Sequence, residues 1–129
     1  MSTNNDNTTT QNEVIAAGHK QLTVEELTKV ISNNTVTGDY FYNKQWRLYR
    51  SYANPNGEIQ GENDLGSFVE GTWVINEDAS LTLEWDGYWD DWTGVAYFFE
   101  DKIKFYDTTS KKWRTTYTKI EAGELDLEL

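Results

Sequence analysis

The sequence predicts an all-β protein, most simply an eight-stranded antiparallel up-and-down β-barrel with one N-terminal helix. After about residue 35, apolar and polar residues alternate with a period of two in short runs, which is typical of half-buried strands. Turn residues separate the runs, and no connection reaches the dozen or more residues that a parallel crossover requires. Closure removes both unpaired sheet edges, so a barrel is favoured and a β-sandwich is the alternative.

Composition narrows the functional classes. The 129 residues fit one domain with a single core. The chain carries 22 acidic and 11 basic residues, a formal net charge of −11, and should therefore repel nucleic acids and anionic membrane surfaces. It has no cysteine, which excludes disulfides and thiolate metal sites. No apolar run approaches the roughly 20 residues of a membrane helix, so we expect no membrane insertion.

The chain divides into a polar tail, one barrel domain and a short acidic end. Residues 1–18 are rich in Asn, Thr and Ser and poor in aromatic residues, so we expect a disordered tail. Residues 19–122 form the predicted barrel domain, and residues 123–129 form an acidic C-terminal tail. A leader of this composition often follows an export signal. The protein is therefore expected to be periplasmic or secreted if such a signal has been removed, and cytoplasmic otherwise.

One helix is predicted, over residues 23–33. Thr23 and Glu26 have the spacing of a capping box, and Asn33 and Asn34 tolerate the left-handed backbone of a helix end. We expect the apolar face of this helix to close one end of the barrel. The residues of that face recur at helical spacing: Val24, Leu27, Val30 and Ile31.

Eight strands follow the helix, each a short run bounded by turn residues. In the last strand, alternation places Trp113, Thr115 and Tyr117 on one face and Arg114 on the other. The predicted strands cover residues 35–42, 45–53, 58–62, 67–75, 80–85, 92–99, 102–106 and 112–119.

Successive turns of an up-and-down barrel lie at alternate ends, which sorts the loops into two groups. The tight turns share one end with the helix. The longer loops gather at the opposite end and form a mouth. The loops at the mouth are residues 43–44, 63–66, 86–91 and 107–111.

An aromatic and acidic cluster lies around the loop at residues 86–91. Tryptophan and tyrosine rings can stack on a sugar or a planar ligand while carboxylates hydrogen-bond its hydroxyl groups. Tyr88 and Trp89 lie outside the strand alternation, where a core role is hardest to assign. The candidate ligand-binding residues of this cluster are Asp86, Tyr88, Trp89, Asp90, Asp91 and Trp92.

Other interpretations of the cluster stay open. Trp85 and Trp92 could be cross-strand core residues, with aspartates that only solubilise the loop. The aspartates could hold Ca²⁺, but their spacing lacks the EF-hand pattern, which favours an incidental acidic loop. A carboxylate pair could act as in glycosidases, yet any acidic protein offers many such pairs. No catalytic, phosphate-binding or zinc motif appears. We therefore predict no catalytic residue, no metal site and no cofactor, and leave enzymatic activity undecided.

Arg50 is a further candidate ligand-binding residue. Alternation places it on the same face as Trp46, Leu48 and Tyr52. If that face lines the lumen, Arg50 is a buried cation and needs a carboxylate partner or an anionic ligand. Two alternatives stay open, either a position of Arg50 at the rim or the opposite register. The opposite register turns the following residues inward: Arg47, Tyr49 and Ser51.

Short glycine-based motifs extend across the predicted barrel. They are Asn34-Thr-Val-Thr-Gly38, Pro55-Asn-Gly57, Gly61, Gly71-Thr-Trp73 and Leu81-x-Leu83-x-Trp85. In these motifs, over about residues 22–120, the chain resembles a group of small, mostly exported bacterial proteins of unknown function with a lipocalin-like (calycin-like) β-barrel. The resemblance implies a barrel and export, and no particular activity.

The functional prediction is non-enzymatic binding of a small molecule or a glycan at the mouth of the barrel. The alternative is a protein–protein interaction module with a packed, ligand-free barrel. The two differ in where apolar side chains are exposed, since a mouth site is concave and an interface needs a larger flat patch. A protein partner therefore remains possible.

Overall fold

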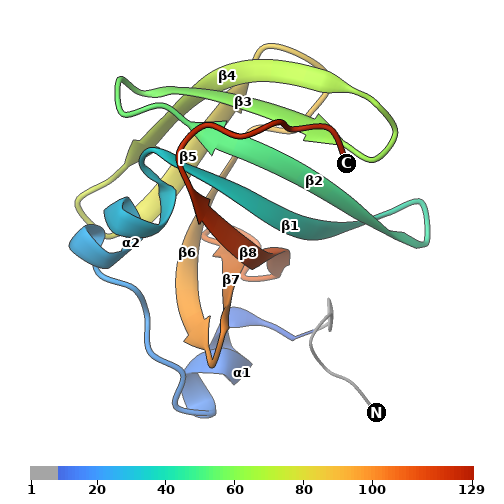
Figure 1. Ribbon diagram of the computed structural model, residues 1–129. Coiled ribbons are helices and arrows are strands. Elements are labelled where there is room, and N and C mark those ends of the chain that lie inside the picture. The colour runs from blue at the N-terminus through green and yellow to red at the C-terminus, as the bar shows by residue number, and fades with distance from the viewer. Residues whose placement is uncertain (1–8) are drawn as a thin grey trace.

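The computed structural model describes residues 9–129 and shows a closed barrel of eight antiparallel strands with two short helices (Figure 1). Each strand pairs with its neighbours in sequence, and β1 pairs with β8 to close the barrel. This confirms the predicted architecture, which is compatible with a lipocalin-like fold. The elements are α1 (Gln11–Ala16), α2 (Val24–Ile31), β1 (Asn34–Tyr42), β2 (Gln45–Ala53), β3 (Glu58–Asn63), β4 (Phe68–Ile75), β5 (Ser80–Trp85), β6 (Trp92–Phe99), β7 (Lys102–Asp107) and β8 (Trp113–Ala122).

The strand boundaries follow from the turn residues that separate them. Each predicted boundary lies within one residue of the observed one, except the end of β8, which was expected at residue 119 and lies at Ala122. The β1–β2 turn has positive φ at Asn43 (51°) and Lys44 (62°), the geometry of a two-residue hairpin turn that matches the twist of the strands. Among the described residues, neither helix has the length or the apolar character needed to cross a membrane.

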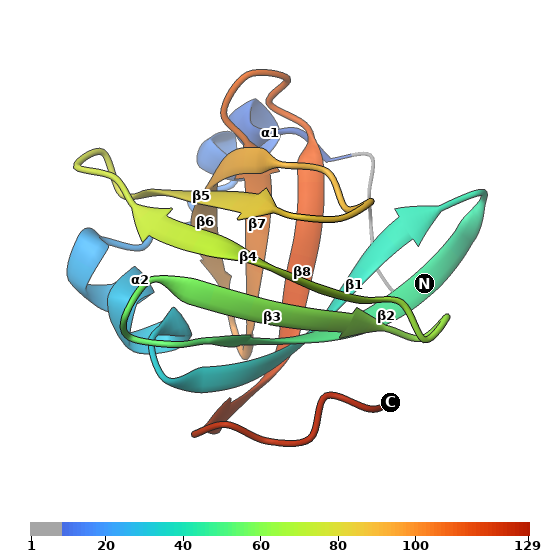
Figure 2. The same cartoon turned by 90° about the horizontal axis from the view of Figure 1, so that it is seen from above.

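Helix α2 closes one end of the barrel, as predicted. Thr23 and Glu26 form the expected capping box, and Asn33 has a positive φ of 60° just after the helix. Leu27 is fully buried and Ile31 is 3% exposed. Figure 2 shows α2 at one end of the barrel and the β1–β2 and β3–β4 connections at the opposite end.

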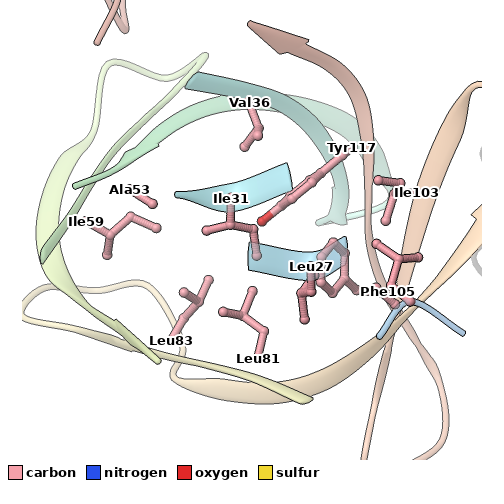
Figure 3. Packing of buried hydrophobic residues seen from close by; sticks show 12 residues of the cluster. Leu27, Ile31, Val36, Ala53, Ile59, Leu81, Leu83, Ile103, Phe105 and Tyr117 are labelled. Carbon is pink, nitrogen blue, oxygen red and sulfur yellow. The ribbon is translucent and has the colours of Figure 1, made fainter. Parts of the chain in front are cut away.

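The main hydrophobic core fills the half of the lumen next to α2. Figure 3 shows the side chains of α2 pointing into the ring of strands. Tyr117 of β8 reaches across this core and packs against Phe105 of β7, with ring centroids 4.6 Å apart. The buried members of the core are Leu22, Leu27, Ile31, Val36, Ala53, Ile59, Leu81, Leu83, Ala96, Ile103, Phe105 and Tyr117.

Residues 9–18 are ordered in the structure, which corrects the expectation of a disordered tail over that range. Thr10 and Glu13 form a capping box at the start of α1, and Thr10 pairs with Lys112 next to β8. Val14 is 1% exposed and belongs to a second apolar cluster. Sequence reasoning missed this contact because one valine in a polar stretch gives no periodic signal. The remainder of the expected tail, residues 1–8, lies outside the described residues. The second cluster contains Val14, Val95, Tyr97, Tyr106 and Trp113.

A β-bulge at the start of β8 changes which side chains face the lumen. Phe105 pairs with Thr115, but the next residue, Tyr106, pairs with Trp113, so Arg114 is the extra residue of the bulge. Trp113 therefore joins the second cluster, and Arg114 lines the open end of the lumen. This corrects the predicted alternation, which placed Trp113 with Thr115 and put Arg114 on the opposite face.

The C-terminal residues 123–129 follow the outside of the barrel. The backbone N–H of Leu125 donates to Thr35 Oγ1 at 3.0 Å, and Leu127 is 8% exposed. Arg50 Nη1 donates to the backbone oxygens of Asp126 and Glu128, at 3.1 and 3.3 Å. The acidic end of the chain is thus held against β1 and β2.

The contact made by α1 can be tested with one substitution. Val14→Ala should lower the free energy of unfolding by about 1 to 3 kcal/mol, since it removes two buried methyl groups and leaves a cavity. Ile15→Ala is the matched control, because Ile15 lies on the same helix and is 53% exposed. Urea unfolding of both variants measures the difference. Equal stabilities of the two variants would mean that α1 is not docked.

Candidate functional site at the open end of the barrel

A cavity of about 420 Å³ occupies the end of the lumen opposite α2, and no residue of that helix lines it. Its wall includes Tyr42 at the end of β1 and residues from the β3–β4 and β5–β6 connections, for example Leu65 and Tyr88. These are two of the four connections that loop parity assigns to the mouth, and the β1–β2 turn follows Tyr42 directly. The walls are mainly aromatic, and the rings that line the interior are Tyr40, Tyr49, Trp85, Trp89, Trp92 and Tyr117.

The two aromatic residues in the middle of the β5–β6 loop have different positions. Tyr88 is 97% exposed at the rim. Trp89 is half-buried and packs edge-on against Trp85, with ring centroids 4.8 Å apart. Its ring also covers Gly61 of β3, where an added Cβ would lie 2.6 Å from Trp89 Cζ3. Gly61 therefore leaves the space into which Trp89 inserts.

Trp92 and Trp85 lie at the ends of the strands that the loop connects, and both line the cavity. Trp92 also packs edge-on against Phe105, with centroids 5.7 Å apart. Both tryptophans are half-buried and pack against the main core. Their core role and their place in the cavity wall are thus compatible.

The three aspartates of the loop do different things. Asp90 lines the cavity. Asp91 Oδ1 accepts a hydrogen bond from the backbone N–H of Trp85 at 2.7 Å, so this carboxylate fixes the loop to the end of β5. Asp86 is exposed and lies outside the cavity wall. Within residues 9–129, no group of three or more histidine and acidic side chains could hold a metal ion.

Arg50 lies on the outer face of the barrel, away from the cavity. Its guanidinium contacts the C-terminal residues and Thr37 Oγ1, at 3.3 Å from Nε. The alternative register is the observed one, since Tyr49 and Ser51 line the cavity. Period-two alternation did not decide this, because the apolar residues Trp46 and Leu48 on the outer face remain exposed.

Arg114 is the cavity residue that sequence reasoning missed. Its side chain is 33% exposed, and its Nη2 lies 3.7 Å from Asp90 Oδ2. The guanidinium carbon lies 5.7 Å from the centroid of the Trp92 ring, within the range of a cation–π contact. Arg114 faces the cavity only because of the bulge, and nothing in the local sequence marks a bulge there.

Hydroxyl groups line the inner part of the cavity. Tyr49 OH lies 2.7 Å from Thr115 Oγ1, which donates to the backbone oxygen of Asp39 at 2.7 Å. Thr115 has only one hydroxyl hydrogen, so Tyr49 must donate to Thr115. The Tyr117 hydroxyl points into the lumen (Figure 3) and makes no hydrogen bond within the described residues. Ser51, 4% exposed, adds a further hydroxyl.

Burial is the main electrostatic influence on the inner tyrosines. It raises the pKa of Tyr49 and the pKa of Tyr117 above the usual value for a phenol. Both groups are therefore neutral hydrogen-bond donors at neutral pH. On the outer side of this wall, burial also raises the pKa of the Asp39 carboxyl to about 6.

The chain shows no significant match to any protein-family model, to any curated protein or to any solved structure. Its function must therefore be inferred from the geometry of the barrel itself.

Proposed function

We propose that this protein binds a small ligand, either a small molecule or a sugar unit of a glycan, in the open half of its barrel and catalyses no reaction on it. The observation that carries the proposal is the aromatic cavity of about 420 Å³. Small-ligand sites are typically concave, mainly apolar, about 300 to 1,000 Å³ in volume, and supplied with a few placed polar groups.

The chemistry of the cavity wall supports this proposal. Trp85, Trp89 and Trp92 offer aromatic surface on which a ring can stack. Tyr117 is 3% exposed, and its hydroxyl faces the lumen without a partner in the described part of the chain. This hydroxyl faces the cavity and can donate a hydrogen bond to an acceptor atom on a ligand.

A protein-interaction surface is the second candidate, because apolar side chains are exposed on the outside of the β1–β2 hairpin. Phe41 and Trp46 are 42% and 41% exposed and pack edge-on with centroids 5.1 Å apart. Leu48 lies on the same strand as Trp46 and is 45% exposed. Phe41 also lines the cavity, whereas Trp46 and Leu48 do not.

Membership of the group of small, mostly exported bacterial proteins with lipocalin-like barrels also stays a proposal. The barrel architecture agrees with it. Export is tested by fractionating cells that produce the native gene product, and recovery from the periplasm or the medium would support it. Recovery from the cytoplasm alone would count against it.

The ligand-binding proposal can be tested with N-phenyl-1-naphthylamine, a neutral dye that fluoresces in apolar sites. The unmodified protein should bind it, and Ser51→Phe should weaken binding at least tenfold, because the new ring fills the cavity from β2. Thr72→Phe is the control, since Thr72 is exposed on the outside of β4. Absence of dye binding, or equal binding by both variants, would count against a ligand site in the lumen. Binding of the same variants to a panel of immobilised glycans tests whether the ligand is a sugar unit.

A further inference from the structure

Arg114 is the one basic side chain among the described residues that line the cavity. The bulge in β8 brings it there, two-thirds buried, with its guanidinium over the ring of Trp92. Desolvating a cation is costly unless it is paired, so a basic side chain held in an aromatic wall needs a counter-charge. Whether the protein itself supplies a strong counter-charge decides whether Arg114 is available to an anionic group on a ligand.

The counter-charge within the protein is Asp90, and its contact with Arg114 is weak. The Nη2–Oδ2 distance of 3.7 Å is longer than a hydrogen bond, and the Asp90 side chain is 83% exposed. Water and salt screen such a pair strongly. The guanidinium carries five N–H donors and makes no side-chain hydrogen bond within residues 9–129. An oxyanion on a ligand could therefore replace Asp90 and hydrogen-bond directly to Arg114.

We infer that the ligand is a ring compound that carries a single oxyanion, such as a carboxylate or a sulfonate. The oxyanion binds Arg114 near the mouth, and the ring lies among Trp85, Trp89 and Trp92. This inference rests on the proposed function and specifies the ligand of the same cavity. An arginine fork matches the two oxygens of a carboxylate.

The charges around the cavity limit the ligand to one negative group. The whole chain has a formal net charge of −11, which repels multiply charged anions such as nucleotides. Arg114 compensates one charge at short range. Neutral hydroxyl groups, among them those of Tyr117 and Ser51, line the inner part of the cavity, so a charged group there would lose its hydration without a charged partner. The oxyanion therefore stays at the mouth, and a neutral acceptor such as a carbonyl or hydroxyl oxygen suits the inner end.

Two dyes with one ring system separate the charge from the ring. 1-Anilinonaphthalene-8-sulfonate has the rings of N-phenyl-1-naphthylamine and one added sulfonate. The unmodified protein should bind the sulfonate dye more tightly than the neutral dye. Arg114→Gln should weaken binding of the sulfonate dye about tenfold or more, which is the loss expected for one charge-assisted hydrogen bond. The same substitution should change the affinity for the neutral dye less than twofold. Asp90→Asn should tighten binding of the sulfonate dye, because it removes the competing carboxylate.

Lys119→Gln is the matched control, since Lys119 is exposed on the same strand and the substitution changes the net charge equally. It should leave the preference between the dyes unchanged. Equal weakening of both dyes by Arg114→Gln, or tighter binding of the neutral dye by the unmodified protein, would overturn the inference and leave the ligand site in place. If neither dye binds, or Ser51→Phe binds both as the parent does, the proposed function itself fails.

Discussion

Leu27→Ala should lower the free energy of unfolding by about 2 to 5 kcal/mol, and Ile31→Ala should have an effect of the same size. Leu27 is fully buried and Ile31 is 3% exposed, and both point from α2 into the ring of strands. Truncation removes apolar contacts and leaves a cavity in the packed half of the lumen. Denaturant unfolding, followed by circular dichroism, measures the loss.

Val24→Ala is the control for these variants. Val24 begins the same helix but is 37% exposed, so its truncation should cost less than about 0.5 kcal/mol beyond any change in helix propensity. If Leu27→Ala is no more damaging than Val24→Ala, α2 does not close the barrel.

Gly71→Ala should be the most disruptive single-methyl addition in the barrel. A Cβ on Gly71 would collide with the backbone oxygen of Glu84 and lie 3.0 Å from Trp85 Cα, both on the neighbouring strand β5. Backbone atoms cannot rotate away as a side chain can, so β4 and β5 would have to separate. We expect a loss of about 3 kcal/mol or more, at the upper end of the range for overpacked cores.

Gly61→Ala is the matched comparison, because its Cβ would meet the ring of Trp89 and the tip of Trp85 rather than backbone. The Trp89 ring belongs to a loop and can swing outward, so the barrel should keep most of its stability. Tryptophan fluorescence should instead shift to longer wavelength as Trp89 becomes hydrated. Similar melting temperatures for the two variants would show that the β4–β5 approach is not tight.

The barrel could be predicted from sequence because its determinants are local. Period-two runs identify the strands, short connections impose antiparallel neighbours, and the capping box at Thr23 and Glu26 identifies α2. The alternation of loops between the two ends then places Tyr88, Trp89 and Trp92 at the mouth, and all three line the cavity.

The features that sequence analysis did not predict depend on contacts between distant parts of the chain, which no local pattern contains. A bulge adds one residue to β8 and moves Arg114 to the cavity side. In β2, exposed Trp46 and Leu48 give the outer face an apolar appearance, so alternation could not place Arg50. Helix α1 contributes a single buried residue, Val14, to its contact with the barrel. The existence of the cavity is also a long-range property, because it depends on how side chains from many strands fill the lumen together.

The lumen is divided into a packed half and an open half, so most buried core residues lie away from the ligand cavity, the exceptions being Leu83 and Tyr117. The packed half uses Leu27, Ile31 and the inner ends of the strands, whereas the open half uses side chains near the mouth. Substitutions in the mouth loops can therefore accumulate without loss of the folded state, because they leave the packed half intact. Such a barrel can change its specificity through mutation in small steps, and directed evolution confined to residues 86–91 should yield many folded variants.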